Sequence, residues 1–394
     1  MQNEENREVW TYTIKLVSAA VNGYVPAENT EDLPWQSIVD YAGAHSVLNL
    51  VAYSAEHLKV PPPPYFAKLL KEMKMKSVLI EAAQQIETEE AMNKLEKLGI
   101  KHMALKGYNT KNAYPSPDMR TMSDIDILVE ADKRGDAVRS FVDDGFKFCG
   151  EGDLHSNVRR GNIYFEFHGS MVDSEYENLT SYFGDGFSRA ILCDGYNYRY
   201  KLKHEDEYIF MIAHLAKHYR YGGTGIRSVL DLYVYRKAYP NMDFEYISRE
   251  LEKIGLKAFA DRAESLADDW FLGNFDGNFD EFSSYIASGG VYGAEENKLT
   301  NAFILDNMQD SSLRKKKIDN LFTLLFPKRE IMSIRYPVLK KYKFLLPIFY
   351  VVRFFETLFR APKNAKNRME ESVEIFKISK EQIEAQKKSG IDKL

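Results

Sequence analysis

Hydrophobic positions recur with different periods along this chain, and the changes divide it into three parts. Over residues 1–99 they follow helical spacing, and the run PPPP at 61–64 separates two helical stretches, of which the second ends at Gly99. Residues 100–203 switch to short strands and helices, and residues 204–394 return to helical spacing, with a last helix predicted over 369–388. The pattern predicts an α+β core with a small mixed sheet, set between an N-terminal helical region and a C-terminal helical domain.

The middle part predicts an order of short elements. A short strand over 100–107, IKHMALKG, leads into a helical turn and a proline-containing loop. SDIDILVE (123–130) indicates a second strand, and an amphipathic helix that ends at Gly145 follows, with a further strand candidate at FKFCGEG. VRRGNIYFEFHG (158–169) indicates two short strands or one bent strand, with alternate residues on opposite faces.

Two aspartates interrupt the second strand. Asp124 and Asp126 alternate with isoleucines, so a period of two places both carboxylates on one face. Aspartate is rare in strands, and two anions this close repel each other unless a cation or a shared proton lies between them. Glu166 interrupts the later strand and meets them if the strands pair. Three carboxylates without a cysteine favour Mg²⁺ or Mn²⁺, ions that accompany a nucleoside triphosphate.

The residues before the aspartates suit a phosphate. Gly107 stands at a strand-to-helix turn, where a glycine lets backbone N–H groups approach an anion and a following helix start favours it. Lys106 and Arg120 supply cations for the same phosphates. We add Ser123, beside the aspartates, to the candidate nucleotide-binding residues.

Further polar residues are candidates for substrate contact. His214 and His218 stand at i and i+4 on one helix face, with Arg227 and Asp231 on the next helix. His168 shares a face with Glu166, as a substrate contact or a structural hydrogen-bonding group. The histidine pair also has the spacing of zinc ligands but no third ligand nearby, and ordinary packing is a further alternative.

The sequence resembles a known family at these residues. LKGYNTKNAYPSPDMRTMSDIDILV, followed by YFEFHGS, resembles the uncharacterised nucleotidyltransferase-like family of the DNA polymerase β-type superfamily. The resemblance continues through HLAKHYRYGGTGIRSVLDLYVY and FPKREIMSIRYPVLKKYKFLLPIFYVVRFFETLF, so it covers about residues 90–360 and, weakly, the N-terminal helices.

The resemblance implies a role for each motif residue. Asp124 and Asp126 are expected to hold the metal ions that bind the triphosphate, Glu166 to complete the catalytic metal site, and Gly107 to lie in the phosphate-binding turn. Two departures stand out: Lys106 and Gly107 replace the usual Gly-Ser of the turn, and the third acid is a glutamate where many members have aspartate.

Charge and cysteine content bear on the cellular location of the protein and on its contact with membranes. The net charge is −5, but residues 311–370 hold fifteen Lys and Arg against four Asp and Glu. Cys149 and Cys193 are too few for a disulfide framework, and the polar N-terminus has no secretory signal, so we expect a cytoplasmic protein. Pro347 and two charged residues interrupt the apolar stretch 344–359, which argues against a membrane span and leaves peripheral membrane contact open.

These observations give one leading hypothesis and two alternatives. We expect a metal-dependent nucleotidyltransferase that moves a nucleoside monophosphate from an NTP, with ATP as the expected donor, to a hydroxyl of a small molecule or protein. The acidic net charge disfavours a nucleic-acid acceptor. The alternatives are a nucleotide-binding scaffold without catalysis and, less favoured, a glycosyltransferase that uses the D-x-D motif.

Overall fold

A computed structural model describes most of the chain up to residue 290. The described residues are 2–26, 33–152, 155–221 and 223–290, together with 329, 332, 336, 338–350 and 352. The basic segment 311–370 and the apolar stretch 344–359 therefore lie partly outside the described residues, and the final helix that the sequence suggests, 369–388, lies outside them entirely.

A five-stranded mixed sheet forms the centre of the middle part. Its strands lie in the order β1-β2-β5-β4-β3, and only β2 and β5 are parallel neighbours among them. This arrangement confirms the α+β class with a small mixed sheet. The bounds are β1 (His102–Ala104), β2 (Ile125–Val129), β3 (Lys147–Glu151), β4 (His155–Arg160) and β5 (Ile163–His168).

The two faces of this sheet differ in chemistry, as the period-two pattern predicts. Ile125 and Ile127 on β2 join Phe165 and Phe167 on β5 in a buried apolar cluster, and Phe141 of α6 (Arg134–Asp143) packs into it. The alternate positions carry Asp126, Glu166 and His168 on the opposite face. One face is therefore closed by α6, and the other is available for chemistry.

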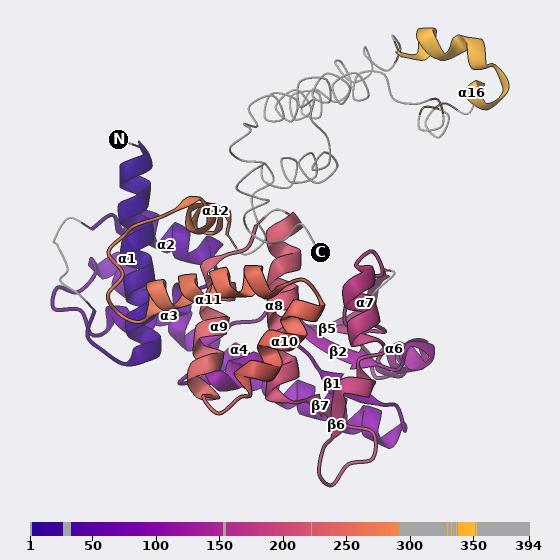
Figure 1. Ribbon diagram of the computed structural model, residues 1–394, viewed down its shortest axis with the longest axis horizontal. Coiled ribbons are helices and arrows are strands. Elements are labelled where there is room, and N and C mark those ends of the chain that lie inside the picture. Colours follow the sequence, from indigo (N-terminus) through magenta and orange to yellow (C-terminus); the bar gives the residue numbers. More distant parts are fainter. Residues whose placement is uncertain are drawn as a thin grey trace.

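Helices come before and after the sheet along the chain (Figure 1). Before β1 lie α1 (Gln2–Asn22), α2 (Trp35–Ala44), α3 (Leu48–Ala55) and α4 (Pro64–Lys97). The turn between β1 and β2 contains α5 (Gly107–Thr110) and the 3₁₀ turns η1 (Lys111–Ala113) and η2 (Pro117–Met119), and η3 (Ala131–Lys133) precedes α6. After β5 come α7 (Glu177–Phe183), η4 (Phe187–Arg189), α8 (His204–Tyr221), α9 (Ile226–Ala238), α10 (Phe244–Lys253), α11 (Lys257–Phe271), α12 (Glu281–Gly289), α16 (Val338–Lys341) and η5 (Lys343–Leu345).

The helices before and after the sheet share one hydrophobic core. Val17 of α1 and Trp35 of α2 are buried in the same cluster as Leu230 of α9 and Trp270 of α11. Polar contacts join the same segments, since Ser18 Oγ donates to the Phe271 carbonyl at 3.0 Å. Figure 1 shows these helices beside one another on the left, with the strands of the sheet to their right. Helices α8 and α9 face the sheet on one side, and the common core holds them in place from the opposite side.

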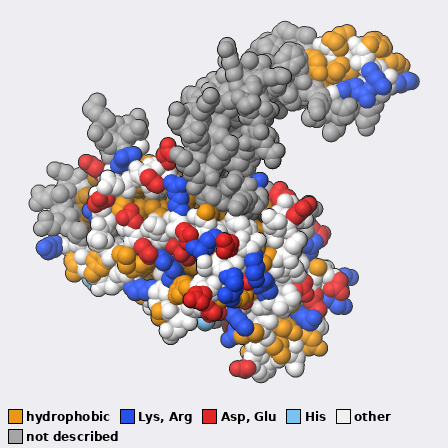
Figure 2. All heavy atoms as spheres, in the orientation of Figure 1, with side chains coloured by type: hydrophobic (Ala, Val, Ile, Leu, Met, Phe, Trp, Pro, Cys, Tyr) orange, Lys and Arg blue, Asp and Glu red, His pale blue; other side chains and the backbone are white. Residues whose placement is uncertain are grey.

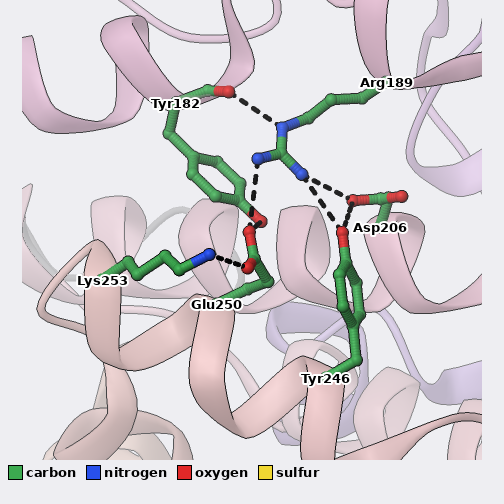
Figure 3. A network of polar contacts seen from close by, with 6 residues as sticks. All are labelled: Tyr182, Arg189, Asp206, Tyr246, Glu250 and Lys253. Carbon is green, nitrogen blue, oxygen red and sulfur yellow. Dashed lines mark hydrogen bonds and ion pairs between the residues drawn. The ribbon is translucent and has the colours of Figure 1, made fainter.

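A network of charged and aromatic side chains ties α7, α8 and α10 together (Figure 3). Arg189 Nη1 donates to Asp206 on α8 at 2.9 Å, and its Nη2 donates to Glu250 on α10 at 3.3 Å. Tyr182 of α7 donates to the same Glu250 at 2.9 Å, and the Arg189 guanidinium lies 3.5 Å from its ring centroid. The network fixes the N-terminal end of α8 against α7 and α10.

A two-stranded sheet beside this network has no counterpart in the sequence prediction. β6 (Ala190–Leu192) pairs antiparallel with β7 (Tyr200–Leu202), directly before α8. Three residues are too few for a hydrophobic period to be distinguished from a loop, so the sequence pattern gives no signal here.

The described surface mixes both signs of charge. On the face drawn in Figure 2, acidic and basic side chains are interspersed, with hydrophobic side chains between them. In the part of the chain that the structure describes, no helix combines the length and the apolar character needed to cross a membrane.

A buried glutamate on α8 makes the stability of the fold depend on pH. Glu207 accepts a hydrogen bond from Asn109 at 3.0 Å, but its Oε1 has no partner among the described residues, and burial raises its pKa to about 7. The folded state thus holds this proton more tightly than the unfolded state. Below the ordinary pKa of a glutamate, both states hold the proton and Glu207 does not lower the free energy of unfolding. As the pH rises toward 7, the free energy of unfolding falls.

We therefore expect Glu207→Gln to stabilise the protein by about 2 kcal/mol more at pH 8 than at pH 5. Chemical denaturation of both proteins at the two pH values measures the difference. Glu252→Gln, on the exposed side of α10, is the matched control and should show no such dependence. An equal effect of Glu207→Gln at both pH values would contradict the argument.

Candidate active site

A cleft of about 320 Å³ lies between the polar face of the sheet and the helices α8 and α9. Each residue that the sequence nominated for catalysis, nucleotide binding or substrate contact lines it: Lys106, Gly107, Arg120, Ser123, Asp124, Asp126, Glu166, His168, His214, His218, Arg227 and Asp231. Segments more than 100 residues apart in the sequence therefore meet in one place.

Strand pairing brings the carboxylates together. β2 and β5 run parallel with Asp126 directly opposite Glu166, so the D-x-D motif and the third acid are neighbours in the sheet. Asp124 lies just before β2 and lines the same cleft. Burial, and then the negative charges of Asp126 and Glu166, raise the pKa of Asp124 above its ordinary value. The site thus concentrates negative charge, as the sequence suggests.

Asp126 is the buried centre of the site. Its Oδ1 lies 2.7 Å from Lys106 Nζ and 2.7 Å from His168 Nε2. Although burial opposes ionisation, the Lys106 ammonium and the hydrogen bond with His168 hold the pKa of Asp126 well below its usual value. Asp126 Oδ2 accepts no hydrogen bond from the described residues. The carboxylate is thus charged, with one oxygen engaged and one available.

Lys106 reaches Asp126 from an unusual backbone conformation. Its φ of 51° and ψ of −122° lie in a region that L-residues rarely adopt, although the residue is a lysine and not a glycine. Such conformations persist only where the surroundings impose them, and they cluster at functional sites. Here the ion pair with Asp126 and the turn into α5 hold the residue in place.

Gly107 is required by close packing. A Cβ atom on it would lie 2.4 Å from Arg120 Nη1 and 2.8 Å from Met122 Sδ. Arg120 is itself fixed, because Nε and Nη2 donate to Asp231 at 2.8 Å each, and Tyr114 donates to the same carboxylate at 2.7 Å. The glycine therefore lets the Arg120–Asp231 pair lie directly against the turn that carries Lys106.

The helical wall of the cleft carries a pair of neutral histidines. His214 Nε2 and His218 Nε2 lie 3.1 Å apart on α8. Burial lowers the pKa of His218 to about 4 and that of His214 well below its ordinary value. One ring therefore donates to the other at neutral pH. Nearby on α9, Arg227 Nη1 donates to the Thr121 carbonyl at 3.0 Å.

Among the cleft-lining residues that the sequence analysis did not nominate, one is a further histidine. His155, the first residue of β4, pairs with His168 across the sheet and lines the cleft. The sequence pattern starts a strand at 158, so it gave no reason to place residue 155 beside the site. Among the described residues, His155, Glu166 and His168 form a group of metal-ligating side chains whose ligand atoms all lie within 4.8 Å of one another.

Comparison with protein families identifies the chain. A family model described as an uncharacterised nucleotidyltransferase matches residues 31–272. The chain belongs to this family. The match covers the sheet, both walls of the cleft and every nominated site residue. A comparison with curated proteins gave no match.

The packing at Gly107 predicts a specific destabilisation in this family member. Gly107→Ala should lower the free energy of unfolding by about 1–3 kcal/mol, because the new methyl group overlaps a guanidinium fixed by Asp231. Urea denaturation measures the loss. Gly135→Ala on α6 is the control, since a Cβ there meets no atom within 4 Å and alanine favours the helix. Equal stabilities for the two variants would contradict the packing argument.

The backbone at Lys106 predicts an unusual order of stabilities. Lys106→Gly and Lys106→Ala both remove the ammonium, but only glycine relaxes at this φ and ψ. We expect Lys106→Gly to be more stable than Lys106→Ala by about 1–3 kcal/mol, measured by thermal or chemical unfolding. A more stable alanine variant would show that the residue is not strained.

Proposed function

We propose that the protein is a metal-dependent nucleotidyltransferase that transfers a nucleoside monophosphate from an NTP, with ATP as the expected donor, to the hydroxyl of a small molecule or protein. The observation that carries this proposal is the register of β2 and β5, which sets Asp126 opposite Glu166 beside Asp124 in one cleft. Membership of a nucleotidyltransferase family supports the same reaction class.

The donor set fits a hard divalent cation, Mg²⁺ or Mn²⁺. Asp124, Asp126 and Glu166 offer carboxylate oxygens, and Asp126 Oδ2 is available. Burial first, and then the negative charges of Asp126 and Glu166, raise the pKa of Asp124. A cation held there supplies Lewis-acid polarisation of the phosphate oxygens. The residues themselves supply the position of that charge and exclude bulk water from the buried side of Asp126.

The cationic side chains of the cleft suit the polyphosphate. Lys106 lines it beside the carboxylates, with Arg120 behind Gly107 and Arg227 on α9. Lys106 replaces the serine that is usual at this turn and offers a charge where that serine offers a hydroxyl. Because α5 is a single helical turn of four residues, this ammonium and not the helix dipole carries the phosphate contact at the turn.

The reaction needs a base near the acceptor. The acceptor oxygen attacks the α-phosphorus, the bond from that phosphorus to the bridging oxygen breaks, and pyrophosphate leaves. Glu166 is half-buried at the cleft and accepts the hydroxyl proton in this proposal. The neutral pair His214 and His218 lines the opposite wall, where it contacts the acceptor or the nucleoside through hydrogen bonds and not through charge.

Calorimetric titration of ATP, GTP, CTP and UTP, with and without Mg²⁺, tests the nucleotide site and names the donor. Asp124→Asn is the variant of choice, because Asp124 is half-buried and, among the described side chains, bonds only its neighbour Ser123. We expect metal-dependent NTP binding that weakens at least about tenfold in the variant, a loss of about 1.4 kcal/mol or more.

The control is Asp132→Asn. Asp132 is an exposed aspartate of η3, so this substitution removes the same charge outside the cleft. It should bind as the wild type does. Absence of NTP binding in the wild-type protein, or equal binding by wild type and Asp124→Asn, would contradict the proposal.

A further inference from the structure

We infer that His155, Glu166 and His168 bind a transition-metal ion of the Mn²⁺ to Zn²⁺ series, at a site beside the D-x-D motif. Their ligand atoms lie within 4.8 Å of one another, and they come from two antiparallel neighbouring strands. Glu166 Oε2 lies 3.5 Å from His168 Nε2 and 3.9 Å from His155 Nε2. Small shifts of the side chains suffice to surround one ion.

The strands explain why these three side chains meet. His155 is directly opposite His168 in the β4–β5 ladder, and Glu166 lies two residues before His168 on the same face. The two imidazole rings lie 5.1 Å apart between centroids. Since strand pairing fixes the backbone of all three residues, the ligands are preorganised and do not depend on a loop.

Burial gives the site an inner and an outer side. The His168 side chain is 3% exposed and that of Glu166 is 15% exposed, while that of His155 is 32% exposed. An ion can therefore enter past His155 and keep a coordination position open toward the cleft. Open positions are typical of catalytic metal sites, in contrast to closed structural ones.

The hydrogen bonding of these histidines differs from that of structural histidines in the same chain. His45 bonds the Ala287 carbonyl and accepts from the Ile226 N–H, and His102 bonds the Ile100 carbonyl, so backbone groups fix both rings. For His155 and His168, the Nδ1 atoms have no partner among the described residues, and the Nε2 atoms face only carboxylates. No hydrogen bond to a described backbone group therefore fixes either of these two rings.

The protonation pattern permits ligation. His168 Nε2 lies 2.7 Å from Asp126 Oδ1 and carries the proton of that hydrogen bond. When Nε2 ligates an ion, the ring proton moves to Nδ1, which makes no hydrogen bond to the described residues. Asp126 then faces the ion in place of the proton.

The mixed nitrogen and oxygen donors determine the class of ion. Mg²⁺ prefers oxygen ligands, whereas imidazole nitrogen favours the later divalent ions; affinity rises from Mn²⁺ to Cu²⁺ and is lower again at Zn²⁺. On the proposed function, this ion adjoins Glu166 and so lies where the acceptor hydroxyl loses its proton. That role rests on the proposed function, whereas binding of the ion does not.

Metal binding to the full-length protein without nucleotide tests the inference. The metal-free protein is titrated calorimetrically with Zn²⁺, Mn²⁺ and Mg²⁺, and the visible absorption of Co²⁺ reports nitrogen ligation independently. We expect one equivalent of Zn²⁺ to bind more tightly than Mg²⁺. His155→Gln should weaken Zn²⁺ binding at least about tenfold and change the Co²⁺ spectrum, since even changes outside the ligand set cost this much at metal sites.

Two further variants make the result decisive. His57→Gln removes an exposed histidine after α3 and should bind as the wild type does. Glu166→Gln replaces the shared carboxylate and should weaken binding as His155→Gln does, with folding of each variant verified by circular dichroism. No Zn²⁺ binding by the wild type, or undiminished binding by folded His155→Gln and Glu166→Gln, would overturn the inference.

The Asp124→Asn variant separates this inference from the proposed function. It should keep Zn²⁺ binding and lose Mg²⁺-dependent NTP binding. If Zn²⁺ binding requires His155 but no NTP binds, the metal site stands and the transferase proposal fails. If NTP binding requires Asp124 but Zn²⁺ binding does not require His155, the transferase proposal stands and the metal-site inference fails.

Discussion

The charge of Asp126, buried in a central strand, is the constraint on which the rest of the site depends. An isolated carboxylate at this depth would be strongly disfavoured, so the fold must supply compensating partners. Lys106 and His168 both meet its Oδ1 at 2.7 Å, one from the turn after β1 and one from β5. The unusual backbone of Lys106 and the parallel pairing of β2 with β5 meet that demand, because each delivers one of the two partners.

The rigidity of the cleft comes from a core that does not follow the order of the sequence. Helices α1 to α3 and α8 to α12 bury their apolar faces together, so the wall that carries His214 and His218 is fixed by residues from both ends of the described chain. The opposite wall is fixed by the apolar face of the sheet against α6. The long connection between β1 and β2 adds Lys106, Arg120 and Asp124 to the cleft, and the ion pairs of Lys106 with Asp126 and of Arg120 with Asp231 fix that connection to the two walls.

The sequence was informative where a residue conflicted with its local pattern. Asp126 and Glu166 stand out as charges in alternating apolar strands, and the α+β class follows from the same periods. The sequence did not predict which distant side chains form pairs. Nothing near Lys106 indicates a bond to Asp126, and nothing near Arg120 indicates its pairing with Asp231. His155 was missed because β4 begins three residues before the apolar alternation does, and strand register alone brings it to His168.

The distribution of charge in the site explains where a cation is needed. Lys106 already balances Asp126, so the uncompensated negative charge lies on Asp124 and Glu166, at the two flanks of the buried pair. Asp124 has only a serine hydroxyl as a described polar side-chain partner, whereas Glu166 has two imidazoles within 4 Å. The two flanks therefore differ in chemistry: the first offers hard oxygen donors, and the second mixes oxygen with nitrogen. On the two proposals above, Glu166 is shared between the oxygen donor set with the aspartates and the mixed donor set with the two histidines.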